Sequence, residues 1–300
     1  AWGYNGYGVL GSGDYCTNSA GVTDYRSRPA RVALDFTLYG GIKKFIASGY
    51  SNNRSCMVQT NDGQLWFWGY STYAAGWGYG ATETTILKPR RLKELIYENS
   101  SSVGMDQTPM VGQLIDVVSN CDEFWYEGRN AYESVYLKEK STGLMYGMGY
   151  QTNYFMPFNR GAMINDGNTN AIYYNQDANN PIMMSIGDFK DVKCVWSSGN
   201  GTAARGVYFL NRDGRMWATG GNATEASLGI GVNGVQAVVS QQITLPWEYE
   251  LNPGIYVGGQ VRWADSIDMI SPYSEYGFGA ITKNNRFVFC GSGGGTYNFS

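Results

Sequence analysis

The chain has 300 residues, a formal net charge of −3 and no histidine, and only 16% of its residues are charged. The small negative charge gives no basic footprint for nucleic acid, so DNA and RNA binding are disfavoured. Without histidine the chain cannot build a Ser-His-Asp or Cys-His site, and it lacks the commonest protein ligand of transition metals. No run of about 18 apolar residues is present, so we expect no insertion into a membrane.

One strand-like segment recurs along the chain, and each copy is rich in aromatic residues and ends in a glycine. The copies end at Gly69, Gly149, Gly220 and Gly291, which are 80, 71 and 71 residues apart. A partial copy ends near Gly3. Self-similarity of this kind indicates an array of one structural unit. We therefore interpret residues 1–300 as a single repeat domain or part of one, and we expect a longer polypeptide because the chain begins inside a repeat ending.

Each unit has four predicted parts in chain order. The first is an irregular strand that begins at a proline, since proline cannot donate to a ladder. The first regular strand is predicted at 41–48, 114–119, 189–196 and 264–271, and the second at 55–60, 134–139, 206–211 and 277–282. Their alternating apolar residues indicate one buried face. A tight turn then leads into the aromatic strand. The opening prolines are Pro29, Pro89, Pro181 and Pro246.

Such a meander cannot bury both of its faces alone, but meanders stacked around an axis cover one another. The sequence therefore predicts an all-β fold, a β-propeller of four-stranded antiparallel blades. It has four complete repeats and an N-terminal partial repeat. A β-sandwich is the alternative, although a sandwich does not require one strand's sequence to recur.

The order of these elements resembles the repeat of the regulator of chromosome condensation family. The segment W2-GYNGYGVLGSGD-14 follows the family signature most fully, and looser copies follow Gly69 and Gly220. The resemblance extends over the whole chain and implies a propeller. The units here are longer than the family's usual repeat and lack its histidine. No residue matches the surface loops behind the founding member's nucleotide exchange, so neither exchange nor chromatin binding is carried over.

Aromatic residues that follow the repeated glycines, or lie in the long polar connection at 156–188, are the candidate ligand-binding residues. Tyrosine and tryptophan in loops suit contacts with a glycan or a protein, because ring faces stack and neighbouring amides donate hydrogen bonds. Packing of the loops on themselves is the alternative. The candidates are Tyr70, Tyr73, Trp77, Tyr79, Tyr150, Tyr154, Tyr173 and Tyr174.

Other reactive groups give no catalytic pattern. The five cysteines are scattered without a CxxC pair, so zinc is not indicated, and strand cysteines such as Cys56 are expected to be small buried hydrophobes. Neighbouring carboxylates, such as Asp122 and Glu123, are interpreted as surface acids. The sequence predicts no cofactor and no metal site.

We interpret the chain as a non-enzymatic binding or structural module. The composition, rich in Tyr, Asn and Gly, favours an extracellular or virion-exposed protein such as a phage fibre. Its predicted partners are other subunits of an assembly and a host glycan or protein receptor. An intracellular interaction scaffold or exchange-factor-like propeller is the alternative. A polysaccharide-active enzyme is a second alternative.

Overall fold

The structure is a computed structural model in which two compact units are formed, one by residues 1–151 and 163–183, the other by residues 152–162 and 184–300. No helix in the part of the chain that is described is long and apolar enough to cross a membrane. The residues described are 1–14, 25–50, 53–70, 85–100, 115–129, 132–149, 182–183, 191–198, 206–214, 216–220, 237–242, 267–274, 277–283, 285 and 287–291.

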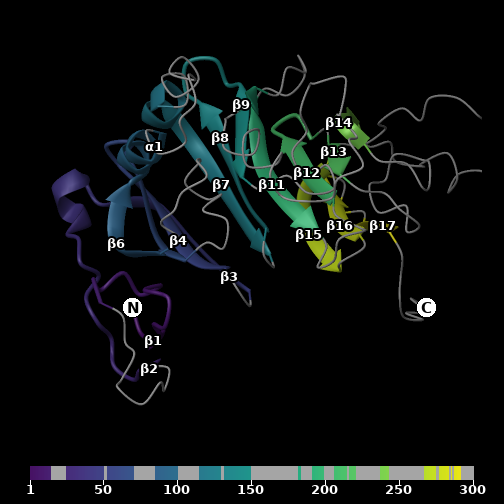
Figure 1. Ribbon diagram of the computed structural model, residues 1–300. Coiled ribbons are helices and arrows are strands. Elements are labelled where there is room, and N and C mark those ends of the chain that lie inside the picture. The colour runs from purple at the N-terminus through teal and green to yellow at the C-terminus, as the bar shows by residue number, and fades with distance from the viewer. Residues whose placement is uncertain are drawn as a thin grey trace, which may run out of the picture. The chain divides into compact units, whose positions relative to one another are not determined.

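Two four-stranded antiparallel sheets make up most of the first unit (Figure 1). In the first sheet the strands lie in the order β3 (Ile42–Tyr50), β4 (Asn53–Thr60), β5 (Leu65–Tyr70) and β6 (Thr85–Arg91). In the second sheet the order is β10 (Ile182–Met183), β9 (Met145–Gly149), β8 (Tyr132–Glu139) and β7 (Cys121–Arg129).

The second unit repeats this plan with one four-stranded and one three-stranded sheet. The four-stranded sheet has β11 (Val192–Ser198), β12 (Gly206–Asn211), β13 (Met216–Gly220) and β14 (Ala237–Gln242). The other has β15 (Ile267–Ser274), β16 (Gly277–Thr282) and β17 (Phe287–Gly291). The predicted meander is therefore confirmed, and the aromatic strands β5, β9, β13 and β17 carry the repeated glycines.

Three details of the predicted unit are wrong. Residues 115–119 are helical, and the strand predicted at 114–119 begins instead at Cys121. Val117 and Val118 are adjacent and both buried, which a strand with one buried face does not allow. The helix α1 (Leu92–Ser100) follows β6, where the sequence analysis predicted no element. Its buried Leu92 and Leu95 are one helical turn apart.

The third correction concerns the strand that carries proline. Pro89 lies in β6, the fourth strand of the first sheet, so this strand closes a unit and does not open it. Among the described strands β6 pairs with β5 alone and forms an edge, where a missing backbone donor is tolerated.

The four sheets share a β-bulge in their first strand. The register against the second strand shifts between Ile42 and Lys44, and the same shift recurs in β7, β11 and β15. A bulge leaves one residue of the strand without an opposite partner and bends the strand. The residues at the bulge are Lys43, Asp122, Lys193 and Asp268, so lysine and aspartate alternate along the repeats.

These bulge residues join neighbouring sheets within each unit. The Lys43 Nζ donates to the main-chain carbonyl of Asp122 at 2.7 Å. In the second unit Lys193 donates to the main-chain carbonyl of Asp268, and its Nζ lies 3.1 Å from that residue's carboxylate. In the described part of the chain β7 and β15 are edge strands, and their outer carbonyl groups pair with no other strand. Lys43 and Lys193 therefore donate hydrogen bonds to edge-strand carbonyl groups of the next sheet.

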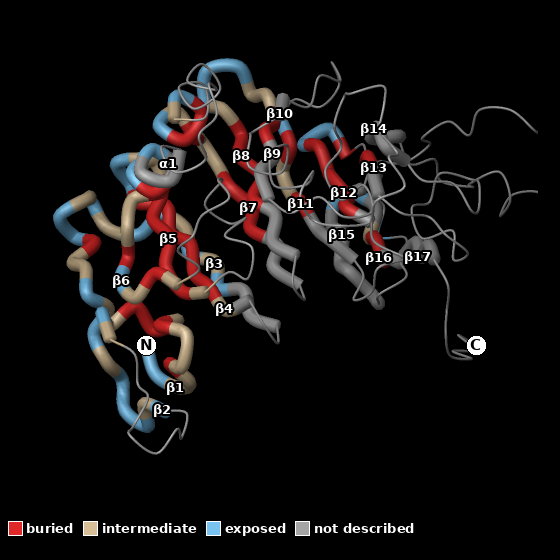
Figure 2. The backbone as a smooth tube through the Cα atoms, in the orientation of Figure 1, coloured by how far each residue is buried: buried red, intermediate tan, exposed pale blue. Residues whose placement is uncertain are grey.

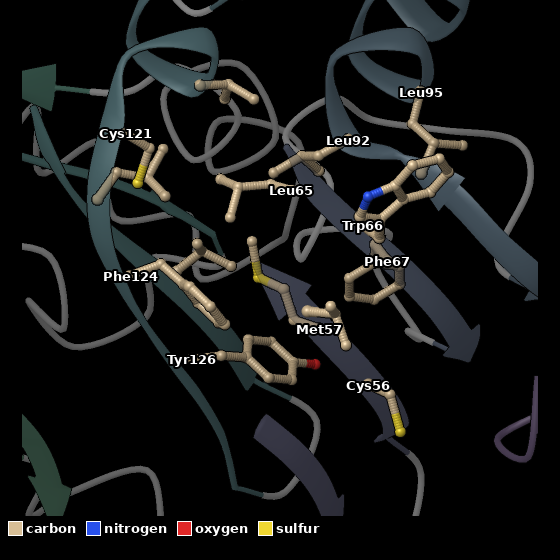
Figure 3. Close-up of a cluster of buried hydrophobic side chains, with 14 of the residues drawn as sticks. Cys56, Met57, Leu65, Trp66, Phe67, Leu92, Leu95, Cys121, Phe124 and Tyr126 are labelled. Atoms are coloured by element: carbon tan, nitrogen blue, oxygen red, sulfur yellow. The ribbon is translucent and has the colours of Figure 1, made fainter. Parts of the chain in front are cut away.

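A hydrophobic core lies between the two sheets of the first unit (Figure 3). Met57 and Phe67 of β4 and β5 face Phe124 and Tyr126 of β7, and the rings of Phe67 and Tyr126 meet edge to face at 6.1 Å. Within this apolar contact the Tyr126 hydroxyl is hydrogen-bonded to the Ser55 hydroxyl. The contact satisfies both polar groups, since an unpaired buried hydroxyl would cost stability.

The N-terminal segment forms the outer half of one more unit. β1 (Gly3–Tyr4) pairs with β2 (Tyr25–Arg26). The register is the same as that between the end of β5 and the start of β6. The first and second strands of such a unit are absent from the part of the chain that is described. The paired residues are Gly3–Arg26 and Tyr4–Tyr25 between β1 and β2, and Gly69–Ile86 and Tyr70–Thr85 between β5 and β6.

The signature segment has a structural role. The buried Asn5 accepts a hydrogen bond from the Leu10 main-chain amide at 3.0 Å and donates to the Asp14 carbonyl at 3.1 Å, so it holds the loop closed. The loop then docks on the first sheet, because the Trp68 indole donates to the Val9 carbonyl at 2.9 Å. The asparagine of the signature is thus required by the fold itself.

Candidate functional site

The most distinctive partly exposed feature of the described residues is a group of four tyrosines around one arginine. We call it the tyrosine–arginine cluster, and it consists of Tyr4, Tyr7, Tyr25, Tyr70 and Arg54. Three structural elements bring it together. The β1–β2 pair positions Tyr4 and Tyr25, the signature loop positions Tyr7, and the paired ends of β4 and β5 position Arg54 opposite Tyr70.

The rings and the guanidinium group are in continuous contact. The Arg54 guanidinium carbon lies 4.4 Å from the ring centre of Tyr4 and 5.2 Å from that of Tyr7. Tyr7 stacks on Tyr70 with 4.7 Å between ring centres, and Tyr4 lies 5.6 Å from Tyr25. A cation over aromatic faces is held in place by the ring quadrupoles, so the cluster is ordered before any partner arrives.

The cluster combines a positive charge with a partly exposed apolar surface. Within the part of the chain that the structure describes, Arg54 makes no ion pair. Tyr25 is exposed, while the other members are half-buried. Tyrosine and arginine are the residue types that most often dominate protein interfaces. The arrangement therefore suits a partner that presents an acidic or acceptor group beside an apolar surface.

Of the eight sequence-predicted ligand-binding residues, the structure places Tyr70 in this cluster. The other seven lie outside the described residues: Tyr73, Trp77, Tyr79, Tyr150, Tyr154, Tyr173 and Tyr174. Sequence reasoning missed Tyr4, Tyr7, Tyr25 and Arg54. A signal was present, because Tyr4 follows Gly3 as Tyr70 follows Gly69. Arg54 could be added only through the pairing of β4 with β5.

The carboxylates of Asp122 and Glu123 belong to an ionic network and differ from the solvated surface acids expected. Lys138 is almost fully buried, and its Nζ lies 2.9 Å from Asp122 and 3.5 Å from Glu123. Lys44 also pairs with Glu123 at 3.5 Å and donates to the Phe124 carbonyl at 2.6 Å. These pairings connect β3, β7 and β8, so the network serves the contact between sheets.

The described residues present no metal cluster, and two of their cysteines are protected by burial. No group of three or more Cys, Asp or Glu residues among them could hold a metal ion. Cys56 and Cys121 are buried free thiols, and burial raises the pKa of each to about 12. The thiolate is the nucleophilic form, so these cysteines are small core hydrophobes, as predicted for Cys56.

This protection can be measured. At pH 8 a thiol with a pKa near 12 is ionised in about one molecule in ten thousand. We expect Cys56 and Cys121 to resist iodoacetamide in the native chain and to react within minutes after denaturation. Peptide mass spectrometry after timed alkylation gives the rate at each site. Rapid native labelling of Cys56 would show that the docking of the signature loop over β4 and β5 is incorrect.

Comparison with known proteins supports the fold. No family model matches the chain, and a search of curated proteins gives no match. Two of the solved structures that resemble it are RCC1-type proteins or are similar to them in fold. Human WBSCR16 is 17% identical with a TM-score of 0.53, and the match covers 96% of this chain and 55% of that protein. Yeast RCC1 (Prp20), solved bound to Kap60, is 14% identical with a TM-score of 0.51, over 93% of this chain and 47% of that one.

The chain has the fold of an RCC1-type β-propeller. This confirms the resemblance drawn from the repeated glycines, the aromatic strands and the signature segment. The chain spans about half the length of these two neighbours. At identities below 20% the likeness establishes fold and carries no function by itself.

Proposed function

We propose that this chain is a non-enzymatic protein-binding propeller and that the tyrosine–arginine cluster is part of its binding face. The observation that carries the proposal is Arg54, a cation that lies over two tyrosine rings and makes no ion pair in the described part of the chain. A partner carboxylate could pair with this cation, while Tyr25 offers an exposed ring for apolar contact.

The structural neighbours favour the scaffold or exchange-factor alternative over the fibre interpretation. Yeast RCC1 was solved in complex with a protein, Kap60. This supports protein binding by a propeller of this kind. For this chain we specify the partner by its chemistry alone, an acidic or acceptor group beside an apolar surface. The fibre interpretation and an extracellular location gain no support from these neighbours and stay predictions, as does the absence of enzymatic activity.

Substitution of Arg54 tests the proposal. Affinity capture with the intact chain supplies the partner, and calorimetry then compares the wild type with Arg54→Ala. We expect the variant to bind about 10- to 30-fold more weakly, which corresponds to about 1.4–2 kcal/mol. Leu38→Ala is the matched control, because Leu38 is an exposed side chain outside the cluster and its loss should leave the affinity unchanged.

Two outcomes would contradict the proposal. One is an unchanged affinity of the Arg54→Ala variant. The other is binding on a glycan array with no protein captured, which would favour the adhesion interpretation. If the captured partner binds guanine nucleotides, the rate of nucleotide release with and without the chain separates an exchange factor from a scaffold.

A further inference from the structure

The tyrosine–arginine cluster brings phenol rings into contact from segments that are distant in the chain. Tyr7 of the signature segment stacks on Tyr70 of β5, with 4.7 Å between ring centres and 29° between ring planes. Tyr4 and Tyr25 lie opposite each other in the β1–β2 pair, with ring centres 5.6 Å apart. Tyr4 also meets Tyr7 edge to face at 6.0 Å. The four rings therefore form one chain of contacts in the order Tyr25, Tyr4, Tyr7 and Tyr70.

This chain of rings has one end open to solvent. Tyr25 is 66% exposed, whereas Tyr4, Tyr7 and Tyr70 are half-buried. Figure 2 shows the contrast, with exposed residues (pale blue) near β2 and buried residues (red) along β5. A phenol gives up one electron readily because its hydroxyl proton leaves at the same time. An electron removed from Tyr25 can then be replaced from Tyr4 and, in turn, from Tyr7, since each ring touches the next.

The Tyr7–Tyr70 pair is the closest of these ring contacts, and the fold holds both of its members in place. The loop that carries Tyr7 is fixed to the first sheet, because the Trp68 indole donates to the Val9 carbonyl at 2.9 Å. Tyr70 lies in β5, which is paired with β4 on one side and β6 on the other. Two radicals formed on these rings therefore stay in contact, and rings this close can meet at their edges by rotation of the side chains.

We propose that the cluster is an oxidative crosslinking site, at which a one-electron oxidant driven by hydrogen peroxide attacks at Tyr25 and joins Tyr7 to Tyr70 as dityrosine. Each of the two coupled phenols loses one electron and its hydroxyl proton and becomes a phenoxyl radical. The radicals form one carbon–carbon bond between the carbons beside the two oxygens, and the hydrogen on each of these carbons moves to the oxygen. Hydrogen peroxide accepts the two electrons and two protons, its O–O bond breaks, and two water molecules form.

Such a bond fastens the signature segment to the first sheet. A crosslink between residues 7 and 70 restricts the unfolded chain and so favours the folded state. It also holds the loop over Cys56, whose Sγ lies 3.6 Å from the Val9 carbonyl oxygen. The crosslink requires no partner protein, so this proposal stands apart from the proposed binding function.

The test oxidises the 300-residue chain with a haem peroxidase and hydrogen peroxide, in an equal mixture of ¹⁴N- and ¹⁵N-labelled protein. Trypsin leaves the three N-terminal tyrosines of the cluster in residues 1–26 and Tyr70 in residues 55–90. A Tyr7–Tyr70 bond therefore joins two peptides, whereas a bond among the N-terminal three stays within one. Fragment spectra assign the joined residues, and the isotope pattern separates bonds within one chain from bonds between chains.

We expect the joined peptide pair from single chains, and its loss in Tyr70→Phe, which keeps the stacked ring but cannot form a phenoxyl radical. Tyr25→Phe should lower the yield. Tyr97→Phe is the matched control and should leave it unchanged, because Tyr97 is 68% exposed and lies outside the cluster. The proposal would be overturned if the pair were absent from the wild type, persisted in Tyr70→Phe or carried mixed isotopes alone. Equal yields in Tyr25→Phe and Tyr97→Phe would also overturn it, since oxidation would then not begin at Tyr25.

Discussion

Gly69→Ala is expected to destabilise the chain by about 2–5 kcal/mol, whereas Gly3→Ala should cost only about 1–2 kcal/mol. Both substitutions force a residue with a Cβ into positive φ, which costs about 1–2 kcal/mol. Only at Gly69 does the new methyl group also collide with the backbone of β4, where Ser55 Cα lies 2.6 Å away. Backbone cannot move aside as a side-chain end can, so the overlap adds about 1–3 kcal/mol.

Urea unfolding followed by circular dichroism measures both variants, and Gly63→Ala supplies the cost of positive φ in an open turn. We expect Gly3→Ala and Gly63→Ala to be similar and Gly69→Ala to stand apart. Equal losses for Gly3→Ala and Gly69→Ala would contradict the difference in packing between the two equivalent positions.

Phe124→Ala is expected to cost about 3–5 kcal/mol, whereas Phe45→Ala should cost less than about 1 kcal/mol. The two residues occupy the same position in β7 and β3, but Phe124 is enclosed by the core and Phe45 is open to solvent. Removing an enclosed ring leaves a cavity and forfeits its burial, whereas an exposed ring loses little by truncation. The same denaturation experiment measures both changes.

A large loss for Phe45→Ala would show that this residue is covered and would contradict its exposure to solvent. A small loss for Phe124→Ala would instead contradict the core between the first and second sheets. The pair of variants therefore separates an error in the core from an error at the exposed side of β3.

The sequence predicted the repeated strands because their constraints are local. Gly69 needs positive φ, the turn at Asp62–Gly63 needs the same freedom, and aromatic residues between them favour a strand. Residues 115–119 were predicted wrongly because Ile115, Val117 and Val118 fit either a short strand or a helical turn. Contacts with other parts of the fold decide between strand and helix, and a local sequence pattern gives no information about those contacts.

The candidate site was predictable only in part for a related reason. Tyr70 could be found because it follows a repeated glycine. Arg54 could not, since its role depends on the pairing of β4 with β5 and on the approach of the signature loop. The exposed face at Trp2 and Phe45 was also invisible to sequence patterns, because these residues look like their buried equivalents. Only comparison of burial between repeats reveals it.

A crystal structure of the chain tests the central claim most directly, namely that one β unit recurs along the chain and that the N-terminal segment forms the outer half of a further unit. When β3–β5 is superposed on each later set of three strands, the repeated glycines should coincide, as should the four bulges at Lys43 and its equivalents. Superposing β5–β6 on β1–β2 should place Gly69 on Gly3, both with positive φ. Bulges at unrelated positions, or Gly3 in an ordinary extended strand, would contradict the account.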